Sequence, residues 1–318
     1  MGRSSVAGAS KGLHYTRKIM WQCVIWVILY IALIFILPPN VATMTRYHLS
    51  ALAYKVATTT LALPELASWL AAFWGYSKLK SYASVIAASR DNTSFHRLAL
   101  GGAWLAWSLP ITATLKLIFG AMTTTSQPGF HSASVIIYTY VALVFACIAF
   151  SFIAQSAKDI ASFYRIHISL KSSRLIMLIF LLFGILYCFL IFQHLTPLNL
   201  TSAHNPYFLP VWLLIISVTI PYLYAWFIGL LSAYQILLTS YRVHGLLYAK
   251  ALQLLIIGLM IVIVSFIGLQ YVTSVVPQNY DVVFNLQLLI GHAVRIINAI
   301  GFLTIALGAN KLKRIEEV

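Results

Sequence analysis

Long apolar stretches, separated by short polar connections, run through almost the whole chain. A helix that crosses a hydrocarbon core about 30 Å thick needs about 20 apolar residues, whereas a transmembrane strand needs about 10 residues of alternating polarity. The stretches are too long and too uniform for strands, so the pattern predicts an all-α integral membrane protein, a bundle of about eight transmembrane helices with short loops. The predicted spans are approximately 20–37, 50–74, 98–119, 133–154, 175–194, 207–238, 250–275 and 285–309.

Two of these predicted spans depart from a simple apolar helix. The second contains Lys55, Pro64 and Glu65, and the sixth, at about 32 residues, must tilt, kink or protrude. Proline removes a backbone N–H and kinks a helix. We therefore expect kinks at Pro64, Pro110 and Pro221, in the second, third and sixth spans.

Composition supports the membrane assignment. The chain has 318 residues, of which 61% are hydrophobic and only 8% are charged, against roughly 25% charged residues in soluble domains. An ordinary soluble enzyme, a disordered chain and a coiled coil are thereby excluded. No connection is long enough for a second domain, so we expect a basic tail at 1–19, a single transmembrane domain at 20–309 and a charged helix end at 310–318.

The net charge of +15 is explained by topology. Basic residues accumulate in cytoplasmic segments, and with a cytoplasmic N-terminus the outer connections hold only Arg46. We therefore expect a plasma (cytoplasmic) membrane protein with both termini cytoplasmic and with anionic inner-leaflet lipids as partners. Nucleic-acid binding is not expected, because no soluble basic domain is present. The inner segments hold 17 of the 21 Lys and Arg residues: Arg3, Lys11, Arg17, Lys18, Lys78, Lys80, Arg90, Arg97, Lys158, Arg165, Lys171, Arg174, Arg242, Lys250, Lys311, Lys313 and Arg314.

Four ionisable residues, Lys55, Glu65, Lys116 and Arg295, fall within predicted spans. Charges at membrane depth are costly and mark candidate functional sites. Lys55 and Lys116 lie toward the outer ends of the second and third spans, where a long side chain can reach the interface. They are therefore either interfacial groups or a pair of cations that line an outer vestibule.

Arg295 lies about ten residues from either end of the eighth span and cannot reach the interface easily. Gln287, Gly291, Arg295 and Asn298 follow one another at spacings that place them on one helix face, and His292 lies beside that face. We expect this polar stripe to face the bundle interior or a water-filled cavity.

Glu65 is the only acidic residue within any predicted span, and we hypothesise that it neutralises Arg295, directly or through water. The predicted limits place Glu65 nearer the inner side than Arg295, so the depths do not match perfectly. A purely structural pair and a functional pair are both compatible with the sequence.

No convincing signature of catalysis or of cofactor binding is present. The chain contains no HExxH or GxxxxGK[ST] pattern, and its one GxSxG match, Gly8 to Gly12, lies in the polar N-terminal tail, without the strand-to-helix turn that such a nucleophile needs. Cys23, Cys147 and Cys188 lie in apolar spans without paired spacing, and His292 alone among the histidines is clearly within a span, so a haem pair is not indicated. We expect no cofactor and no metal.

Three classes of function remain. The first is a non-enzymatic, sensor-like module or a subunit of a membrane complex; short loops and the lack of a convincing catalytic motif favour it, and a protein partner at fixed stoichiometry would do so too. A homo-oligomer is also compatible with the sequence and would favour transport. The second is a transporter or channel for a small solute, including an anionic one, that uses the polar interior around Arg295 and Glu65. The third, a membrane enzyme acting on lipid, lacks the interfacial polar residues that it would need.

Overall fold

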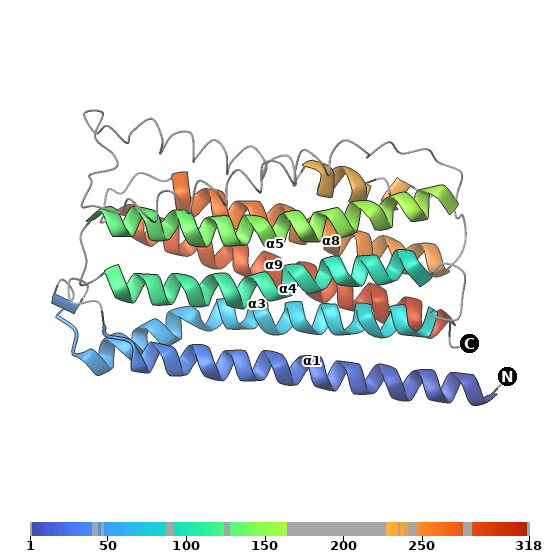
Figure 1. The fold of residues 1–318 in the computed structure, drawn as a ribbon, viewed down its shortest axis with the longest axis horizontal. Coiled ribbons are helices and arrows are strands. Elements are labelled where there is room, and N and C mark those ends of the chain that lie inside the picture. Colours follow the sequence, from blue (N-terminus) through green and yellow to red (C-terminus); the bar gives the residue numbers. More distant parts are fainter. Residues whose placement is uncertain are drawn as a thin grey trace.

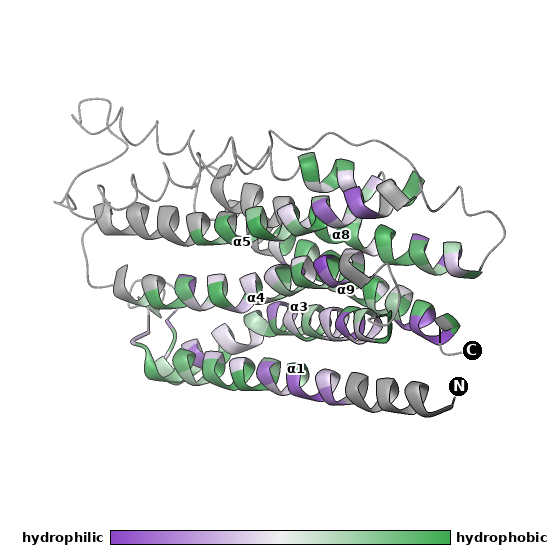
Figure 2. Cartoon of the chain, turned by 45° about the vertical axis from the view of Figure 1, so that its right-hand side comes forward, coloured by the Kyte–Doolittle hydropathy of each residue, from purple (hydrophilic) through white to green (hydrophobic). Residues whose placement is uncertain are grey.

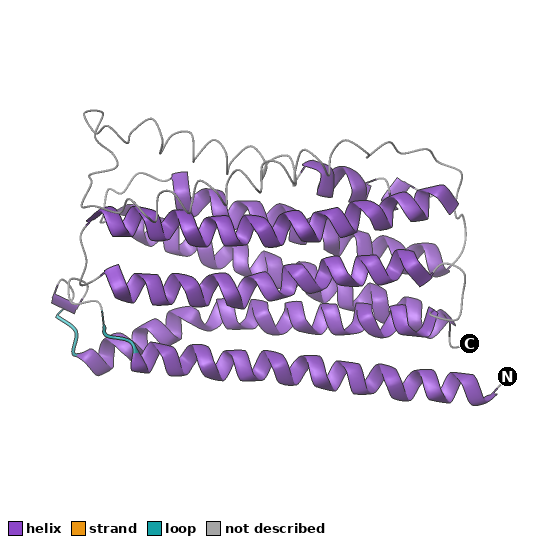
Figure 3. Cartoon of the chain, viewed as in Figure 1, coloured by secondary structure: helices purple, strands orange, loops and turns teal. Residues whose placement is uncertain are grey.

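The structure is a computed structural model, and the part that it describes is entirely helical apart from short connections (Figures 1 and 3). The described residues are 2–39, 44–45, 48–86, 92–123, 128–163, 227–234, 236–238, 240, 247–275 and 282–316. Six long helices lie within them: α1 (Gly2–Ile36), α3 (Ala51–Val85), α4 (Asn92–Thr123), α5 (Pro128–Phe163), α8 (Leu247–Val275) and α9 (Val282–Glu316).

The helices run along one common axis and alternate in direction (Figure 1). α1 begins and α9 finishes at the same end of the bundle, which we call the termini end. Five of the described helices are long and apolar enough to cross a membrane. The predicted span at 175–194 and most of that at 207–238 lie outside the described residues. α5 finishes and α8 begins at the termini end.

Several helices are longer than the predicted spans. α1 already begins at Gly2, so the expected tail at 1–19 continues the helix, and α3 extends past the expected residue 74 to Val85. α9 continues beyond its apolar part to Glu316, as the sequence predicts. Hydropathy detects only the apolar part of a helix, whereas backbone hydrogen bonds continue through polar turns.

α9 is packed tightly against α8 and α3 through glycines. A Cβ atom on Gly258 of α8 would lie 2.6 Å from the backbone nitrogen of Ile305, and one on Gly308 of α9 would lie 2.5 Å from that of Leu255. On the other side of α9, a Cβ on Gly75 of α3 would lie 2.8 Å from the carbonyl oxygen of Phe302. Small residues allow helix backbones to approach closely in membranes, so these glycines hold α9 between its two neighbours.

Large apolar side chains are exposed on several described helices, as a lipid-facing surface requires. On α1, Ile28 and Ile36 are 60% and 75% exposed, and Ile296, Ile300 and Leu307 form an exposed apolar stripe on α9. The last turns of α9 are hydrophilic and lie at the termini end of the bundle (Figure 2). This distribution fits helices whose middle parts lie in hydrocarbon and whose ends reach water.

Candidate functional site

The ion pair hypothesised from the sequence is present in the structure. Nη2 of Arg295 lies 3.0 Å from Oε2 of Glu65, and the two side chains are 18% and 17% exposed. α3 and α9 both begin at the end opposite the termini (Figure 1). Glu65 lies about 14 residues after the start of α3 and Arg295 about 13 residues after the start of α9, or about 20 Å along each helix. The expected mismatch in depth was wrong, because α3 continues to Val85 and Glu65 lies well inside it.

α3 bends next to this pair. Pro64 lies within the helix, and the hydroxyls of Thr58, Thr59 and Thr60 donate to carbonyl oxygens one turn back at 2.8, 2.9 and 2.9 Å. An internal proline breaks the backbone ladder, and such hydroxyl bonds add to bending. The first turns of α3 lean away from α4 in Figure 1, and the candidate cavity lies at this end of the bundle.

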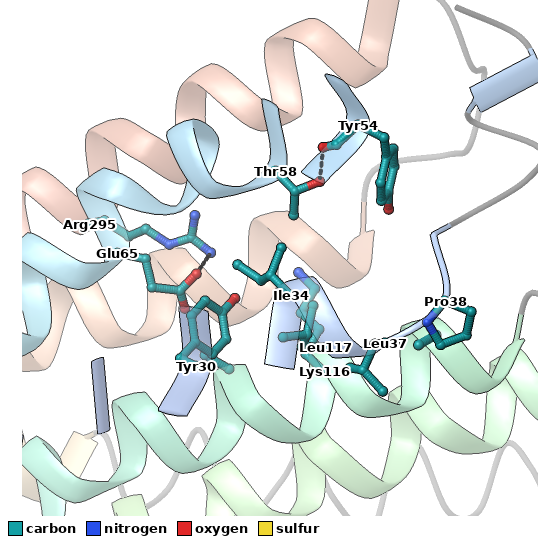
Figure 4. Close-up of a pocket in the computed structure, with 12 residues that line it drawn as sticks. Tyr30, Ile34, Leu37, Pro38, Tyr54, Thr58, Glu65, Lys116, Leu117 and Arg295 are labelled. Carbon is teal, nitrogen blue, oxygen red and sulfur yellow. Dashed lines mark hydrogen bonds and ion pairs between the residues drawn. The ribbon is translucent and has the colours of Figure 1, made fainter. Parts of the chain in front are cut away.

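A cavity of about 260 Å³ extends from the end opposite the termini to the ion pair (Figure 4). Tyr54 and Glu65 both line it and are about 11 residues apart on α3, so it extends along about 16 Å of that helix. Its volume accommodates several water molecules or a small solute. The lining comes from four helices and the connection after α1: Tyr30, Ile34, Leu37, Pro38, Tyr54, Thr58, Glu65, Ala113, Lys116, Leu117, Ala121 and Arg295.

An aromatic layer lies on the termini side of the cavity. The rings of Tyr30 and Trp69 meet edge to face at 5.0 Å, and those of Phe73 and Trp107 do so at 4.9 Å. Trp69 and Phe73 are 1% and 0% exposed. Such pairs pack tightly and add stability beyond their buried area. This layer, drawn from α1, α3 and α4, fills the bundle between the cavity and the termini end.

The two lysines that the sequence grouped together have different places. Lys116 of α4 lines the cavity together with Glu65 and Arg295, and it has no ion pair with any other residue that the structure describes. Lys55 of α3 does not line the cavity. Its ammonium donates to the carbonyl oxygen of Phe35 in the last turn of α1, which satisfies an otherwise unpaired helix-end acceptor. The predicted pair of cations that lines an outer vestibule is therefore wrong, because Lys116 lines the cavity and Lys55 does not.

Asn298 joins three helices one turn beyond Arg295. Its side chain is fully buried; Nδ2 donates to Oγ of Ser68 on α3 at 3.5 Å, and Oδ1 accepts from Oγ of Ser265 on α8 at 3.2 Å. The amide does not line the cavity. Buried polar groups in helix bundles act as interhelical hydrogen bonds, so Asn298 contributes to packing beneath the site.

The remaining residues of the predicted polar stripe are less closely involved. Both ring nitrogens of His292 are buried without a hydrogen-bond partner among the described residues, and His292 does not line the cavity. A Cβ on Gly291 would meet no atom within 4 Å in that part of the structure. Gln287 belongs to α9, but its side chain lies outside the described part. Among the stripe residues whose side chains are described, Arg295 alone lines the cavity.

Sequence reasoning missed the uncharged groups of the cavity, chiefly Tyr30, Tyr54 and Thr58. Their hydroxyls are ordinary in membrane helices, and only the run Thr58–Thr60 beside Pro64 hints at an unusual segment. Among the described residues, no group of three His, Cys, Asp or Glu side chains could hold a metal ion. Cys23 and Cys147 are buried and free. The described site offers charge and hydrogen bonding, the chemistry of solute binding.

Comparison with known proteins finds no family model that matches this chain and no match among curated proteins or solved structures.

Proposed function

We propose that this protein is a non-enzymatic membrane module that receives a small solute in the cavity around Glu65 and Arg295. It acts as a sensor-like input or as a subunit of a membrane complex. The observation that carries the proposal is a charged cavity that reaches mid-bundle from one end, with a packed aromatic layer behind it. A pocket with a few convergent polar groups is a favourable place for a ligand.

The cavity opens at one end of the bundle, which favours binding of a solute over its passage through the protein. A channel needs a continuous polar path, whereas Trp69 and Phe73 lie fully packed on the termini side of the cavity. A bound solute would contact α1, α3, α4 and α9 at once. It could therefore stabilise one arrangement of these helices and transmit its presence to a partner at the termini end.

A transporter is the second candidate, and the position of Pro64 beside Glu65 favours it specifically. A proline within a membrane helix leaves a backbone carbonyl without its helical partner, and such interruptions occur where transporter helices bend. In that case the present arrangement is a state open to one side, and the aromatic layer is the closed gate.

We further propose that both termini face the cytoplasm, in the plasma (cytoplasmic) membrane. Support comes from the described cations in the half of the bundle nearer the termini end, where a positive-inside arrangement needs them and where anionic inner-leaflet lipids would bind. The cavity then opens toward the outside. These cations are Arg17, Lys18, Lys78, Lys80, Arg97, Lys158, Lys250, Lys311, Lys313 and Arg314.

Two measurements on the full-length protein separate the candidates. Native mass spectrometry after gentle extraction from its own membrane should show a second polypeptide at fixed stoichiometry, together with a retained small molecule. Proteoliposomes on a solid-supported membrane should show no sustained current when that small molecule is added. A sustained, solute-dependent current would replace the sensor-like module by the transporter. A lone chain that retains no small molecule would contradict both.

A further inference from the structure

The cavity lining carries an excess of positive charge. Lys116 and Arg295 are balanced only by Glu65. Among the side chains that the structure describes, the other carboxylate is Asp159, which is paired with Arg97 between α4 and α5. The side chain of Lys116 is exposed, and its ammonium has no carboxylate partner among the described residues. A bound anion would complete the balance in the cavity.

Arg295 retains hydrogen-bonding capacity for such an anion. A guanidinium has five N–H donors, and the described contact with Glu65 involves Nη2 alone, so the donors of Nη1 remain for an anion. Lys116 adds an ammonium on the same cavity, from the neighbouring helix α4. The phenol hydroxyls of Tyr30 and Tyr54 also line it and can donate to an oxygen ligand.

Apart from Thr58, whose hydroxyl donates to the carbonyl oxygen of Tyr54, the rest of the lining is apolar. Ile34, Leu37 and Leu117 lie on the α1 and α4 sides of the cavity, between its charged end and the region of Pro38 (Figure 4). A solute that is polar throughout would leave these walls in contact with water or polar atoms, which costs free energy. A short apolar chain would cover them.

We infer that the cavity binds a small monocarboxylate with a short apolar body, with its carboxylate at Lys116 and Arg295 and its chain along Ile34 and Leu117. This inference rests on the proposed solute-binding function and names the class of solute. Charge balance admits one negative charge, and at about 30 Å³ for each water-sized group the cavity of about 260 Å³ holds about eight or nine heavy atoms, carboxylate included.

Glu65 then competes with the carboxylate of the solute for Arg295. Its carboxylate already occupies one side of the guanidinium, so a solute carboxylate must share Arg295 with it or displace it. Glu65→Gln removes the competing charge and raises the net positive charge of the cavity by one. Anion affinity should therefore rise about tenfold, the change that about 1.4 kcal/mol of added attraction produces.

The test is calorimetric titration of the full-length protein in phosphatidylcholine nanodiscs with acetate, butyrate and hexanoate, and with the neutral butyramide. Affinity should rise about fourfold per added methylene until the cavity is filled, and butyramide should bind at least tenfold more weakly than butyrate. Lys116→Met should lose at least tenfold in butyrate affinity. Lys55→Met, the matched control outside the cavity, should bind butyrate as the unaltered protein does.

The outcomes keep the inference separate from the proposed function. Butyramide binding as tightly as butyrate, or Lys116→Met binding butyrate normally, would overturn the monocarboxylate while leaving a solute-binding cavity. If no probe of either charge binds and native mass spectrometry finds no retained solute, the proposed function fails as well. A lipid headgroup has the same anionic chemistry, so nanodiscs containing phosphatidylglycerol form a second arm. If phosphatidylglycerol abolishes butyrate binding, the ligand is a headgroup, which overturns the inference of a free solute.

Discussion

Neutralising either partner of the Glu65–Arg295 pair should lower the free energy of unfolding. Neutralising both should lower it by less than the sum of the two single losses. At 3.0 Å, with an effective dielectric constant of about 20, the attraction is about 5 kcal/mol before desolvation is counted. Removal of one partner from a buried pair costs about 3–5 kcal/mol. Both side chains here keep 17–18% exposure beside a cavity. We therefore expect Glu65→Gln or Arg295→Gln to lower the free energy of unfolding by about 2–3 kcal/mol, with a coupling energy of about 1–2 kcal/mol between the two substitutions.

The assay is reversible unfolding in mixed dodecyl sulfate micelles, without added carboxylates, followed by the fluorescence of the eight tryptophans. The two single variants and the double variant form the cycle. A second cycle pairs Arg295→Gln with Lys55→Met, because Lys55 lies about 15 Å from Glu65 along α3 and donates to Phe35 instead. The second cycle should be additive. The reasoning is refuted if the Glu65–Arg295 cycle is also additive within about 0.5 kcal/mol.

Three further predictions concern packing and topology. Gly258→Ala should destabilise the protein by about 1–3 kcal/mol in the same unfolding assay, because its Cβ would meet the α9 backbone at 2.6 Å. Gly291→Ala, with open space around it, should be neutral or stabilising by up to about 1 kcal/mol, and equal losses at both positions would contradict the packing described. Asn298→Ala should cost about 1–3 kcal/mol, because Ser68 and Ser265 lose a buried partner; no measurable loss would contradict its packing role. In intact cells, and in a background without native cysteines, a membrane-impermeant thiol reagent should label Thr45→Cys and leave Arg314→Cys unlabelled; the reverse pattern would invert the proposed orientation.

The cavity could be anticipated only in part. The contact between Arg295 and Glu65 could be predicted from the sequence, because an isolated charge in a membrane helix needs a partner and only one carboxylate lay within a predicted span. The sequence could not predict that Lys55 contacts a helix end whereas Lys116 lines the cavity. Their difference depends on the direction in which α3 leans, and two lysines at similar depths have no local feature that reveals it.

The sequence by itself determined that this chain is a helical membrane protein, where most of its apolar stretches lie and which charged residues fall within them. These properties follow from transfer of each residue between water and hydrocarbon, which depends on local composition. Tertiary structure alone decided how far α1 and α3 extend, how the glycines of α8 and α9 meet, and which side chains enclose the cavity. These features arise from contacts between helices distant in sequence, where backbone separation and bending, more than residue type, decide whether two groups touch.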